Sequence, residues 1–351
     1  MALSHSPRIV TDGLVLCLDA SNNKSIPKIN ILGTWGDSGG NQANYEILGA
    51  YSVKLKNTTT GWVGYFPATI SSTGKYVITF TYYSDNDGSL LVLDNDGVMD
   101  NTYNTTLTAN ITPQTYTGSV DVTTTGNILH YFRRGSGGNI FVTNVSYFKL
   151  ETTWTDLMGN GNTGTLTNGP TYNSSNGGSI VFDGIDDYVE TGSISGISSS
   201  YNTSLEFFVN VTTNTKGPFV HLQSSTIDGY GIGIGNADYT ENGSKLIMFS
   251  PFTATVNNLY TFPSSGWYHI VVTLGSDNFS WKLYVNGVKR SDFPSGTNSI
   301  SSPLLKIGRV TSGGTTYYGT SSIAEVKVYN KALTASEIQQ NFNALRGRYG
   351  I

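Results

Sequence analysis

The sequence predicts an all-β fold of antiparallel β-sandwiches, of the jelly-roll kind, with one short C-terminal helix. Short apolar segments of strand length recur along nearly the whole chain, and turns rich in glycine, asparagine and aspartate separate them. This spacing is typical of sandwiches and jelly rolls. Only one segment, close to the C-terminus, has the periodicity of a helix. The 351 residues are enough for roughly two domains of about 150 residues each.

The strand-like segments differ in how apolar and polar residues alternate along them and in the turns that join them. Residues 9–19 are apolar at both alternating sets of positions, as in a strand buried on both faces. Asn286-Gly287 joins two segments and is a type I′ hairpin signal. The two Asp-Asn-Asp-Gly segments, at 85–88 and 94–97, are predicted to be hairpin turns. Further strands are predicted at 76–83, 90–93, 179–182, 205–211, 268–274, 281–285, 304–307 and 323–329.

The C-terminal segment carries the signals of a helix. Residues 334–337 (TASE) form a capping box, in which the threonine hydroxyl and the glutamate carboxylate satisfy the first free amides. Ile338, Phe342 and Leu345 then recur at i, i+4 and i+7, and Gly347 is the predicted stop. We expect the apolar stripe of this helix to pack on the edge of a sheet.

The composition excludes several classes of protein. Charged residues make up 13% of the chain, against about 25% in an average soluble domain, and the net charge of −4 leaves no cationic surplus for nucleic-acid binding. No apolar run approaches the ~18 residues of a membrane span. The start of the chain lacks the features of a signal peptide. The lone Cys17 cannot form an internal disulfide and is predicted to be an inert core residue.

Five motifs occur in order in the C-terminal two-thirds of the chain: WTDL at 154–157, SIVFDG at 179–184, GWYHIVV at 266–272, LYVNG at 283–287 and IAEVKVYNKAL at 323–333. In these motifs the chain resembles the laminin-G-like, concanavalin A-like jelly-roll superfamily. The resemblance implies a lectin-like sandwich, and it says little about activity because this fold hosts many functions.

The opening segment resembles the first strand of the same domain in phage-encoded members of the family, notably those of marine and cyanobacterial phages. In those proteins a short loop leads from this strand directly into the Trp-Thr-Asp-Leu motif, whereas a long segment intervenes here. We therefore expect a discontinuous sandwich at 1–27 and 152–351, with a second domain inserted at 28–151. Insertion is tolerated at exposed loops when the ends of the guest lie close together.

The inserted segment resembles a carbohydrate-binding-module jelly roll. The resemblance rests on an early tryptophan, Trp35, a central strand at 76–83 and a closing strand at 140–150. It is a pattern of strands more than a sequence motif.

The residue patterns of enzymes that share this fold are missing. Concanavalin-like glucanases carry a Glu-x-Asp-x-x-Glu strand, which places acid and nucleophile on one sheet face, and no such spacing occurs here. No serine lies in a Gly-x-Ser-x-Gly elbow that precedes a helix. The alternating GIGIG at 231–235 is followed by a turn, so we interpret it as a strand with glycine along one face and not as a dinucleotide-binding loop. We expect a protein that is not an enzyme.

A metal site is the first candidate binding feature. Asp183, Asp186 and Asp187 lie in one tight loop, and clustered carboxylates are typical ligands of Ca²⁺. The alternative is that these side chains make the hydrogen bonds of a turn. Both interpretations stay open on the sequence alone.

Sugar binding is the expectation that both resemblances imply. It needs exposed aromatic faces, on which a pyranose stacks, and polar side chains for the hydroxyls. Trp154, Trp267 and Trp281 fall in strand motifs and are predicted to be core residues. The candidates are Trp35, Trp62, Tyr65, Tyr103, Tyr131 and Arg133 in the insert, and Tyr317 and Tyr318 in the glycine-rich loop at 312–319.

These observations predict a non-enzymatic virion structural protein of a tailed phage, lectin-like and displayed on the tail, the fibres or the head. Its partners would be other virion proteins and a host cell-surface polysaccharide, with no nucleic acid and no membrane insertion. We expect a homo-oligomer in the particle, assembled in the host cytoplasm. The alternatives are capsid decoration without a glycan ligand and a free carbohydrate-binding protein.

Overall fold

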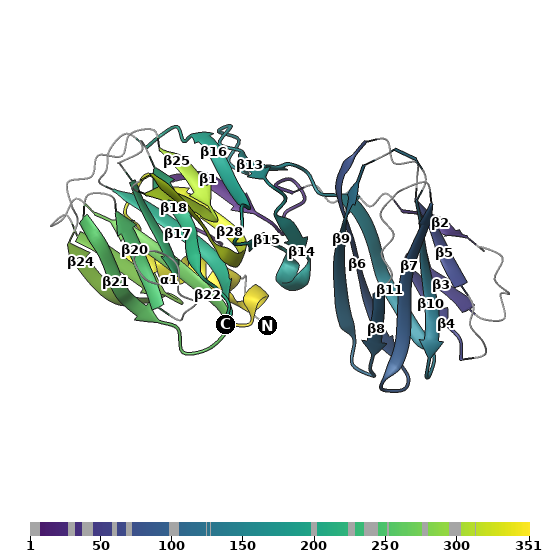
Figure 1. Cartoon of the computed structure of the whole chain (residues 1–351). Helices are drawn as coiled ribbons and strands as arrows, with labels where there is room; N and C mark the ends of the chain where they lie inside the picture. The colour runs from purple at the N-terminus through teal and green to yellow at the C-terminus, as the bar shows by residue number, and fades with distance from the viewer. Residues whose placement is uncertain are drawn as a thin grey trace. The chain divides into compact units, whose positions relative to one another are not determined.

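The computed structural model of the chain describes residues 8–26, 32–36, 45–57, 62–67, 72–97, 105–123, 125–126, 128–197, 202–223, 229–234, 245–250, 253–275, 280–294, 303–312 and 314–351 (Figure 1). The chain divides into two compact units. The main unit comprises Met1–Ile26 and Thr152–Ile351, and the inserted unit comprises Pro27–Glu151. The boundaries expected from the sequence lie within one residue of these.

The main unit is a sandwich of two sheets, each 8-stranded and antiparallel in its described pairings, as the predicted fold class requires. One sheet, which we call the helix-side sheet, runs β14-β15-β28-β17-β22-β23-β24, with β1 also paired to β28. Its strands are β1 (Leu14–Asp19), β14 (Thr171–Asn173), β15 (Ser179–Asp183), β17 (Thr203–Val211), β22 (Gly266–Leu274), β23 (Ser280–Val285), β24 (Val288–Pro294) and β28 (Thr320–Tyr329).

The other sheet of the main unit, which we call the hairpin-side sheet, runs β12-β13-β16-β25-β18-β19-β20-β21. A separate hairpin, β26 (Arg309–Ser312) and β27 (Thr315–Tyr318), packs against β18. The sheet's strands are β12 (Thr153–Trp154), β13 (Gly164–Thr167), β16 (Tyr188–Ser193), β18 (Gly217–Gln223), β19 (Gly229–Ile234), β20 (Lys245–Ser250), β21 (Thr253–Thr261) and β25 (Leu304–Ile307).

The core of the main unit lies between its two sheets, where alternate residues of the strands point inward. Phe207 of β17 contacts Phe219 of β18, with ring centroids 6.1 Å apart. Tyr230 and Trp281 pack at 4.2 Å, and the Tyr230 hydroxyl donates to Thr203 Oγ1. Trp154, Trp267, Trp281 and Cys17 are all buried, as predicted.

The inserted unit is a second sandwich, of two 5-stranded sheets. The rings of Phe80 and Phe132 meet edge to face across its core at 5.0 Å. One sheet comprises β2 (Leu32–Gly36), β5 (Trp62–Pro67), β7 (Ser89–Gly97), β8 (Thr105–Ala109) and β10 (Ile128–Ser136), and the other comprises β3 (Tyr45–Gly49), β4 (Ser52–Leu55), β6 (Gly74–Ser84), β9 (Gln114–Val122) and β11 (Ile140–Lys149).

Three local predictions need correction. The first strand begins at Leu14 and not at residue 9. Residues 85–88 join β6 to β7, which lie in different sheets, so this segment is a corner between sheets and not a hairpin turn. Residues 94–97 continue β7 and pair with β10, because the partner strand supplies ladder hydrogen bonds that override the local turn preference of Asp, Asn and Gly. The strand predicted at 140–150 is β11, which ends one residue earlier, at Lys149. The remaining predicted strands lie within strands of the structure, and Asn286 and Gly287 both have positive φ, as a type I′ turn requires.

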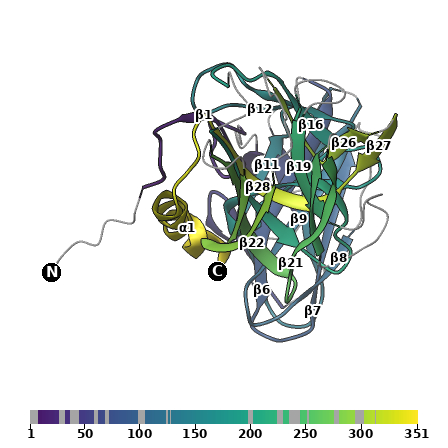
Figure 2. The same ribbon diagram turned by 90° about the vertical axis from the view of Figure 1, so that its left-hand side faces the viewer.

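The helix α1 (Ala335–Tyr349) begins at the predicted capping box, where Thr334 Oγ1 accepts from the Glu337 amide and the Glu337 carboxylate accepts from the Thr334 amide. It ends at Gly350, in the left-handed conformation, and not at Gly347. The helix covers the face of the helix-side sheet and not its edge. The Tyr349 ring stacks on Phe208 of β17 at 4.3 Å. Figure 2 shows α1 and the β26–β27 hairpin on opposite sides of the main unit.

Beneath α1 lies a buried ionic cluster formed by Glu206, Glu325, Lys327, His269 and Asn341. Lys327 Nζ lies 3.3 Å from Glu206 Oε1 and 2.8 Å from Glu325 Oε1. His269 Nε2 lies 3.2 Å from Glu206 Oε1, and Asn341 Nδ2 of the helix donates to Glu206 Oε2 at 2.7 Å. None of the charged side chains of this cluster is more than 4% exposed.

Glu206 and Lys327 stabilise each other's charged form. Burial alone raises the pKa of the Glu206 carboxyl, but the Lys327 ammonium and the hydrogen bonds of His269 and Asn341 outweigh burial and lower the pKa to about 2. Burial lowers the pKa of Lys327, but Glu206 and Glu325 outweigh burial and raise the pKa well above its usual value. Each group therefore depends on the presence of the others.

We predict that Glu206→Gln lowers the free energy of unfolding at pH 7 by about 3–5 kcal/mol, because it leaves Lys327 buried with less compensating charge. Since the pKa of Glu206 falls on folding from 4.5 to about 2, its contribution is complete above pH 4.5 and is lost as the pH falls toward 2. Urea titrations at several pH values measure both effects. The control is Asp292→Asn, which breaks the exposed pair with Lys289 and should leave the midpoint unchanged. Equal midpoints for Glu206→Gln and the wild type would contradict the prediction.

Candidate functional site

The candidate sugar-binding residues of the inserted unit gather in one sheet. Trp35 of β2 pairs in register with Tyr65 of β5, and Trp62 of β5 pairs with Arg133 of β10. Arg133 is half-buried. The side chains of Trp35, Trp62 and Tyr65, and that of Tyr131 in β10, lie outside the described part of the structure. Tyr103 lies outside the described residues altogether.

The two candidate tyrosines of the main unit lie in a strand and not in a loop. The sequence predicts a loop at 312–319, but Thr315–Tyr318 form β27 and pair with β26, because threonine and tyrosine side chains suit a strand. Tyr317 is half-buried against Ile247 and Val310, which makes it a packing residue. The Tyr318 ring lies 6.5 Å from the ring of Tyr188.

A polar cluster, which we call the hairpin-side cluster, lies beside Tyr318 on the hairpin-side sheet. It consists of Tyr188, Glu190, Gln223, Lys306 and Arg309. Arg309 Nη2 donates to Glu190 Oε2 at 2.8 Å, and its guanidinium carbon lies 3.9 Å from the centre of the Tyr188 ring. Lys306 Nζ donates to Gln223 Oε1 at 2.7 Å and lies 3.8 Å from Glu190 Oε2. The cluster thus presents charged and aromatic groups together.

Strand register explains how these residues meet. Glu190 of β16, Lys306 of β25 and His221 of β18 are direct neighbours across three adjacent strands. Their chain neighbours Val189, Leu305 and Ile307 are apolar and buried, so the polar residues occupy the face turned away from the core. Arg309 follows two residues after Ile307 and starts the hairpin that folds back over this face.

His221 lies beside Lys306 on the same sheet face, and the neighbouring strand β19 leaves room for its imidazole because it has glycine at the paired position. The residue paired with it is Gly231, and a Cβ there would lie 2.7 Å from His221 Cδ2. Residues 229–234 are therefore a strand with glycine on one face and the buried Tyr230, Ile232 and Ile234 on the other, as interpreted from the sequence. Burial, and then the charge of Lys306, lower the pKa of His221 to about 3, so its imidazole is neutral at neutral pH.

The sequence patterns of sugar sites did not predict the hairpin-side cluster. The available signal was a polar residue at alternate positions of otherwise apolar strands, as in VHLQ at 220–223 and LLKI at 304–307. Such a pattern predicts a polar outer face. It does not predict which strands lie side by side, because strand order depends on the topology of the whole sheet.

The three predicted metal ligands do come together. One carboxylate oxygen from each of Asp183, Asp186 and Asp187 lies within 4.8 Å of the others. Asp183 and Asp186 are exposed and Asp187 is buried. The same carboxylates also make turn hydrogen bonds: Asp187 Oδ2 accepts from the Asp183 amide at 3.1 Å, and Asp183 Oδ1 accepts from the Ile185 amide at 2.8 Å. The turn role is therefore present, and the clustered carboxylates are also compatible with a hard cation.

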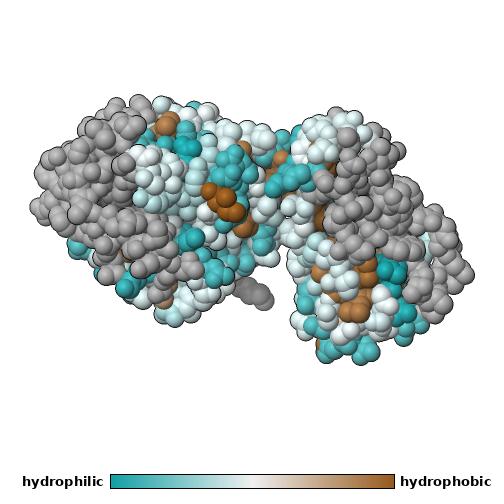
Figure 3. Space-filling view, in the orientation of Figure 1, coloured by the Kyte–Doolittle hydropathy of each residue, from teal (hydrophilic) through white to brown (hydrophobic). Residues whose placement is uncertain are grey.

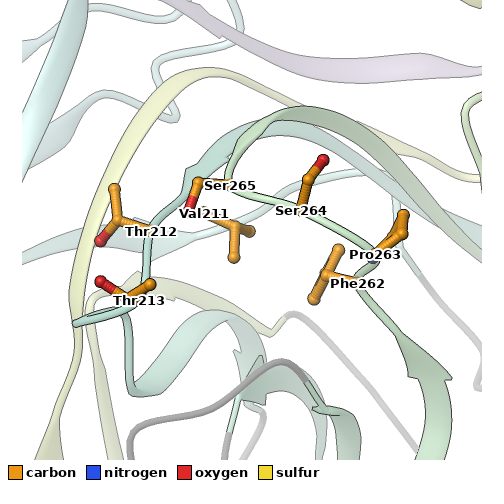
Figure 4. Close-up of a pocket in the computed structure, with 7 residues that line it drawn as sticks. All are labelled: Val211, Thr212, Thr213, Phe262, Pro263, Ser264 and Ser265. Carbon is orange, nitrogen blue, oxygen red and sulfur yellow. The ribbon is translucent and has the colours of Figure 1, made fainter.

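A cavity of about 400 Å³ opens between the loop after β17 and the segment that joins β21 to β22 (Figure 4). Val211, Phe262 and Pro263 supply its apolar wall, and the remaining lining residues are Thr212, Thr213, Ser264 and Ser265. None of these described lining residues is charged, so none of them is suited to acid–base chemistry.

On the face seen in Figure 3 the described surface is mainly hydrophilic, with separate small apolar areas. Among the described residues of the chain, the exposed large apolar residues are Ile47, Leu48, Tyr51, Ile111, Ile185 and Val288. Within the described part of the chain no helix has the length and apolar character needed to cross a membrane.

The main unit is an antiparallel β-sandwich, and its hairpin-side sheet has a polar outer face. Residues 183–339 match a laminin G domain family that is described as the concanavalin A-like lectin/glucanases superfamily, which supports a jelly-roll domain of this class in the main unit. The matched residues include the whole hairpin-side cluster. No curated protein matches the chain.

Several solved structures are similar to part of the chain at low identity. Domain 4 of AbnA, an extracellular arabinanase from Geobacillus stearothermophilus, in complex with arabinotriose, has 20% identity and a TM-score of 0.41 over 53% of this chain and 91% of that chain. A mutant Trypanosoma rangeli sialidase displaying trans-sialidase activity has 15% identity and a TM-score of 0.44, over 57% of this chain and 32% of that one. The receptor-binding domain of botulinum neurotoxin type G has 12% identity and a TM-score of 0.41, over 53% and 47%.

We predict that His221 makes the main unit acid-labile. Since its pKa falls on folding from 6.5 to about 3, the unfolded chain binds one more proton between these pH values. The wild type should lose about 1.4 kcal/mol per pH unit through this group as the pH falls from 6.5 toward 3, with stability complete above 6.5. His221→Gln cannot take up this proton, so denaturant titrations between pH 6.5 and 4.5 should give it the shallower slope. Parallel slopes would contradict the prediction.

Proposed function

We propose that the chain is a non-enzymatic virion structural protein of a tailed phage, displayed on the particle surface, and that it recognises a host cell-surface polysaccharide. Its other partners are virion proteins, including further copies of the chain in a homo-oligomer. We propose that it is assembled into the particle in the host cytoplasm.

The hairpin-side cluster carries the glycan-binding part of this proposal. Lectin sites combine an aromatic surface with polar groups that fix the hydroxyls of the sugar. Tyr188 and Tyr318 supply aromatic surface, and Glu190 and Arg309 supply the polar groups. The side chain of Glu190 is 32% exposed and that of Arg309 is 19% exposed, so a ligand can reach both.

The phage context is supported by the junction around the inserted unit. The opening strand and the Trp-Thr-Asp-Leu motif resemble consecutive parts of one domain in phage-encoded relatives of the family. In the structure the Leu157 amide donates to the Cys17 carbonyl, and the Cys17 amide donates to Asp156 Oδ1. The two segments therefore contact each other although the inserted unit separates them in the sequence, as parts of one domain would.

The absence of activity in this proposal is supported by where the buried carboxylates lie. Glu206 and Glu325 flank one ammonium, but they are 0% and 4% exposed and lie beneath α1. Carboxylates of glycoside hydrolysis must flank the scissile bond of a bound sugar. Two carboxylates that are buried beneath a helix cannot contact the scissile bond of a sugar.

The first test is quantitative mass spectrometry of purified phage particles that encode this chain, with copies counted relative to the major capsid protein. We expect a few to a few dozen copies, as for a tail or fibre protein that contacts the host. Hundreds of copies would instead favour head decoration without a glycan ligand. Absence from the particle would overturn the virion role and leave a free carbohydrate-binding protein.

We also propose that the loop of Asp183, Asp186 and Asp187 holds Ca²⁺. The proposal is supported by three carboxylates within 4.8 Å. The loop leads directly into Tyr188 of the hairpin-side cluster, so a cation there would stiffen one edge of that cluster.

We predict that Asp183→Ala combined with Asp187→Ala lowers the melting temperature more in calcium than in chelator, because only the wild type gains stability from the bound ion. Thermal melts of both proteins in each buffer measure this difference. The matched control is Asp121→Ala in the inserted unit, which should respond equally in both buffers. An equal decrease in the melting temperature of the double variant with and without chelator would contradict the prediction and leave these residues with a turn-forming role alone.

A further inference from the structure

The hairpin-side cluster has more positive than negative charge. Lys306 and Arg309 share one carboxylate, Glu190, whose Oε2 atom lies 3.8 Å from the ammonium and 2.8 Å from the guanidinium. The adjacent His221 is neutral at neutral pH because burial lowers its pKa to about 3. These groups therefore carry a net charge of about +1, on a chain whose total charge is −4.

Lys306 is the cation that Glu190 compensates least. Its short hydrogen bond, 2.7 Å, goes to the neutral amide oxygen of Gln223, while the carboxylate of Glu190 lies at the longer distance of 3.8 Å. An ammonium group has three donors. Its side chain is 10% exposed, so an interaction with an anion at this position is only weakly screened by water.

Arg309 is held in a fixed orientation at the more exposed end of the cluster. One face of its guanidinium lies on the Tyr188 ring, and Nη2 is bonded to Glu190. Among the described residues no acceptor takes the Nε–H. A guanidinium that is oriented by stacking loses little freedom when it binds a planar carboxylate.

We propose that the hairpin-side cluster binds a saccharide that carries a carboxylate, such as a uronic or sialic acid unit. Arg309 and Lys306 bind the carboxylate, and Tyr188 and Tyr318 contact the ring. This inference rests on the glycan-binding function proposed above and adds the class of sugar. A carboxylate balances the excess charge, whereas a neutral sugar would leave it uncompensated in a partly dehydrated site.

The test uses the full chain on an array of uronate- and sialate-containing glycans, each paired with its carboxyl-reduced neutral counterpart, with sulfated neutral glycans as a third set. We expect binding to the carboxylated member to exceed binding to its reduced counterpart by about tenfold or more, since charge-assisted hydrogen bonds supply the difference. Binding should weaken as salt is added. Equal or stronger binding to the sulfated set would overturn the assignment of a carboxylate.

Variants then test the residues by calorimetry with the best-bound glycan. Arg309→Gln and Lys306→Met should each weaken binding of the carboxylated sugar about tenfold and weaken binding of the reduced sugar much less, because the reduced sugar has no carboxylate for these cations to bind. Lys245→Gln removes an exposed lysine from β20 of the same sheet and is the matched control, which should bind like the wild type. Arg309 is the more exposed of the two cations, so its variant keeps the test valid if Lys306→Met fails to fold.

The outcomes separate this inference from the proposed function. Equal affinity for a glycan and its reduced counterpart, or full affinity in a folded Arg309→Gln variant, would overturn the carboxylate and leave glycan recognition standing. Failure to bind any glycan of the array would overturn both.

Discussion

The ion pair between Glu206 and Lys327 is the constraint on which the arrangement of the main unit depends. Each charge is buried and costs several kcal/mol to dehydrate, so neither is tolerated without the other. Asn341 extends the pair into the helix, because its Nδ2 donates to Glu206 while its Oδ1 accepts from the Val10 amide. One side chain thereby fixes the helix and the segment before β1 on the same sheet face. The helix thus covers the outer face of the helix-side sheet. The hairpin-side sheet has the polar hairpin-side cluster on its outer face.

A second constraint acts where the inserted unit leaves and rejoins the main unit. The Thr155 amide donates to the Ser25 carbonyl at 2.8 Å, and the Ser25 hydroxyl donates to the Thr155 carbonyl at 2.5 Å. These residues lie beside the boundaries at Ile26 and Thr152, so the main unit itself clamps the two ends of the insertion together. A guest domain whose ends meet imposes little closure entropy on its host. The long intervening segment therefore leaves the pairing of β1 with β28 intact.

The sequence was sufficient for the fold class, for most strands and for the start of the helix, because these depend on local signals such as the capping box at Thr334 and the turn at Asn286. It was insufficient where tertiary contacts override local preference. The aspartates at 94 and 96 belong to a strand because β10 pairs with them, and the helix passes Gly347 because Tyr349 stacks on Phe208. The hairpin-side cluster could not be predicted for a related reason: its members come from β16, β18, β25 and β26, and only the strand order of the sheet brings them together.

The two charged clusters of the main unit show how burial decides what the same side chains can do. Beneath α1, Lys327 is fully buried between two carboxylates, so its charge is compensated and serves stability. On the opposite sheet, the buried Lys306 and the more exposed Arg309 share one carboxylate, so their charge is compensated only in part. The exposure of Arg309 and Glu190 limits the desolvation penalty of that excess, while the aromatic ring of Tyr188 and the amide of Gln223 keep the cations in place. An uncompensated but ordered charge is a property of a binding surface more than of a structural core.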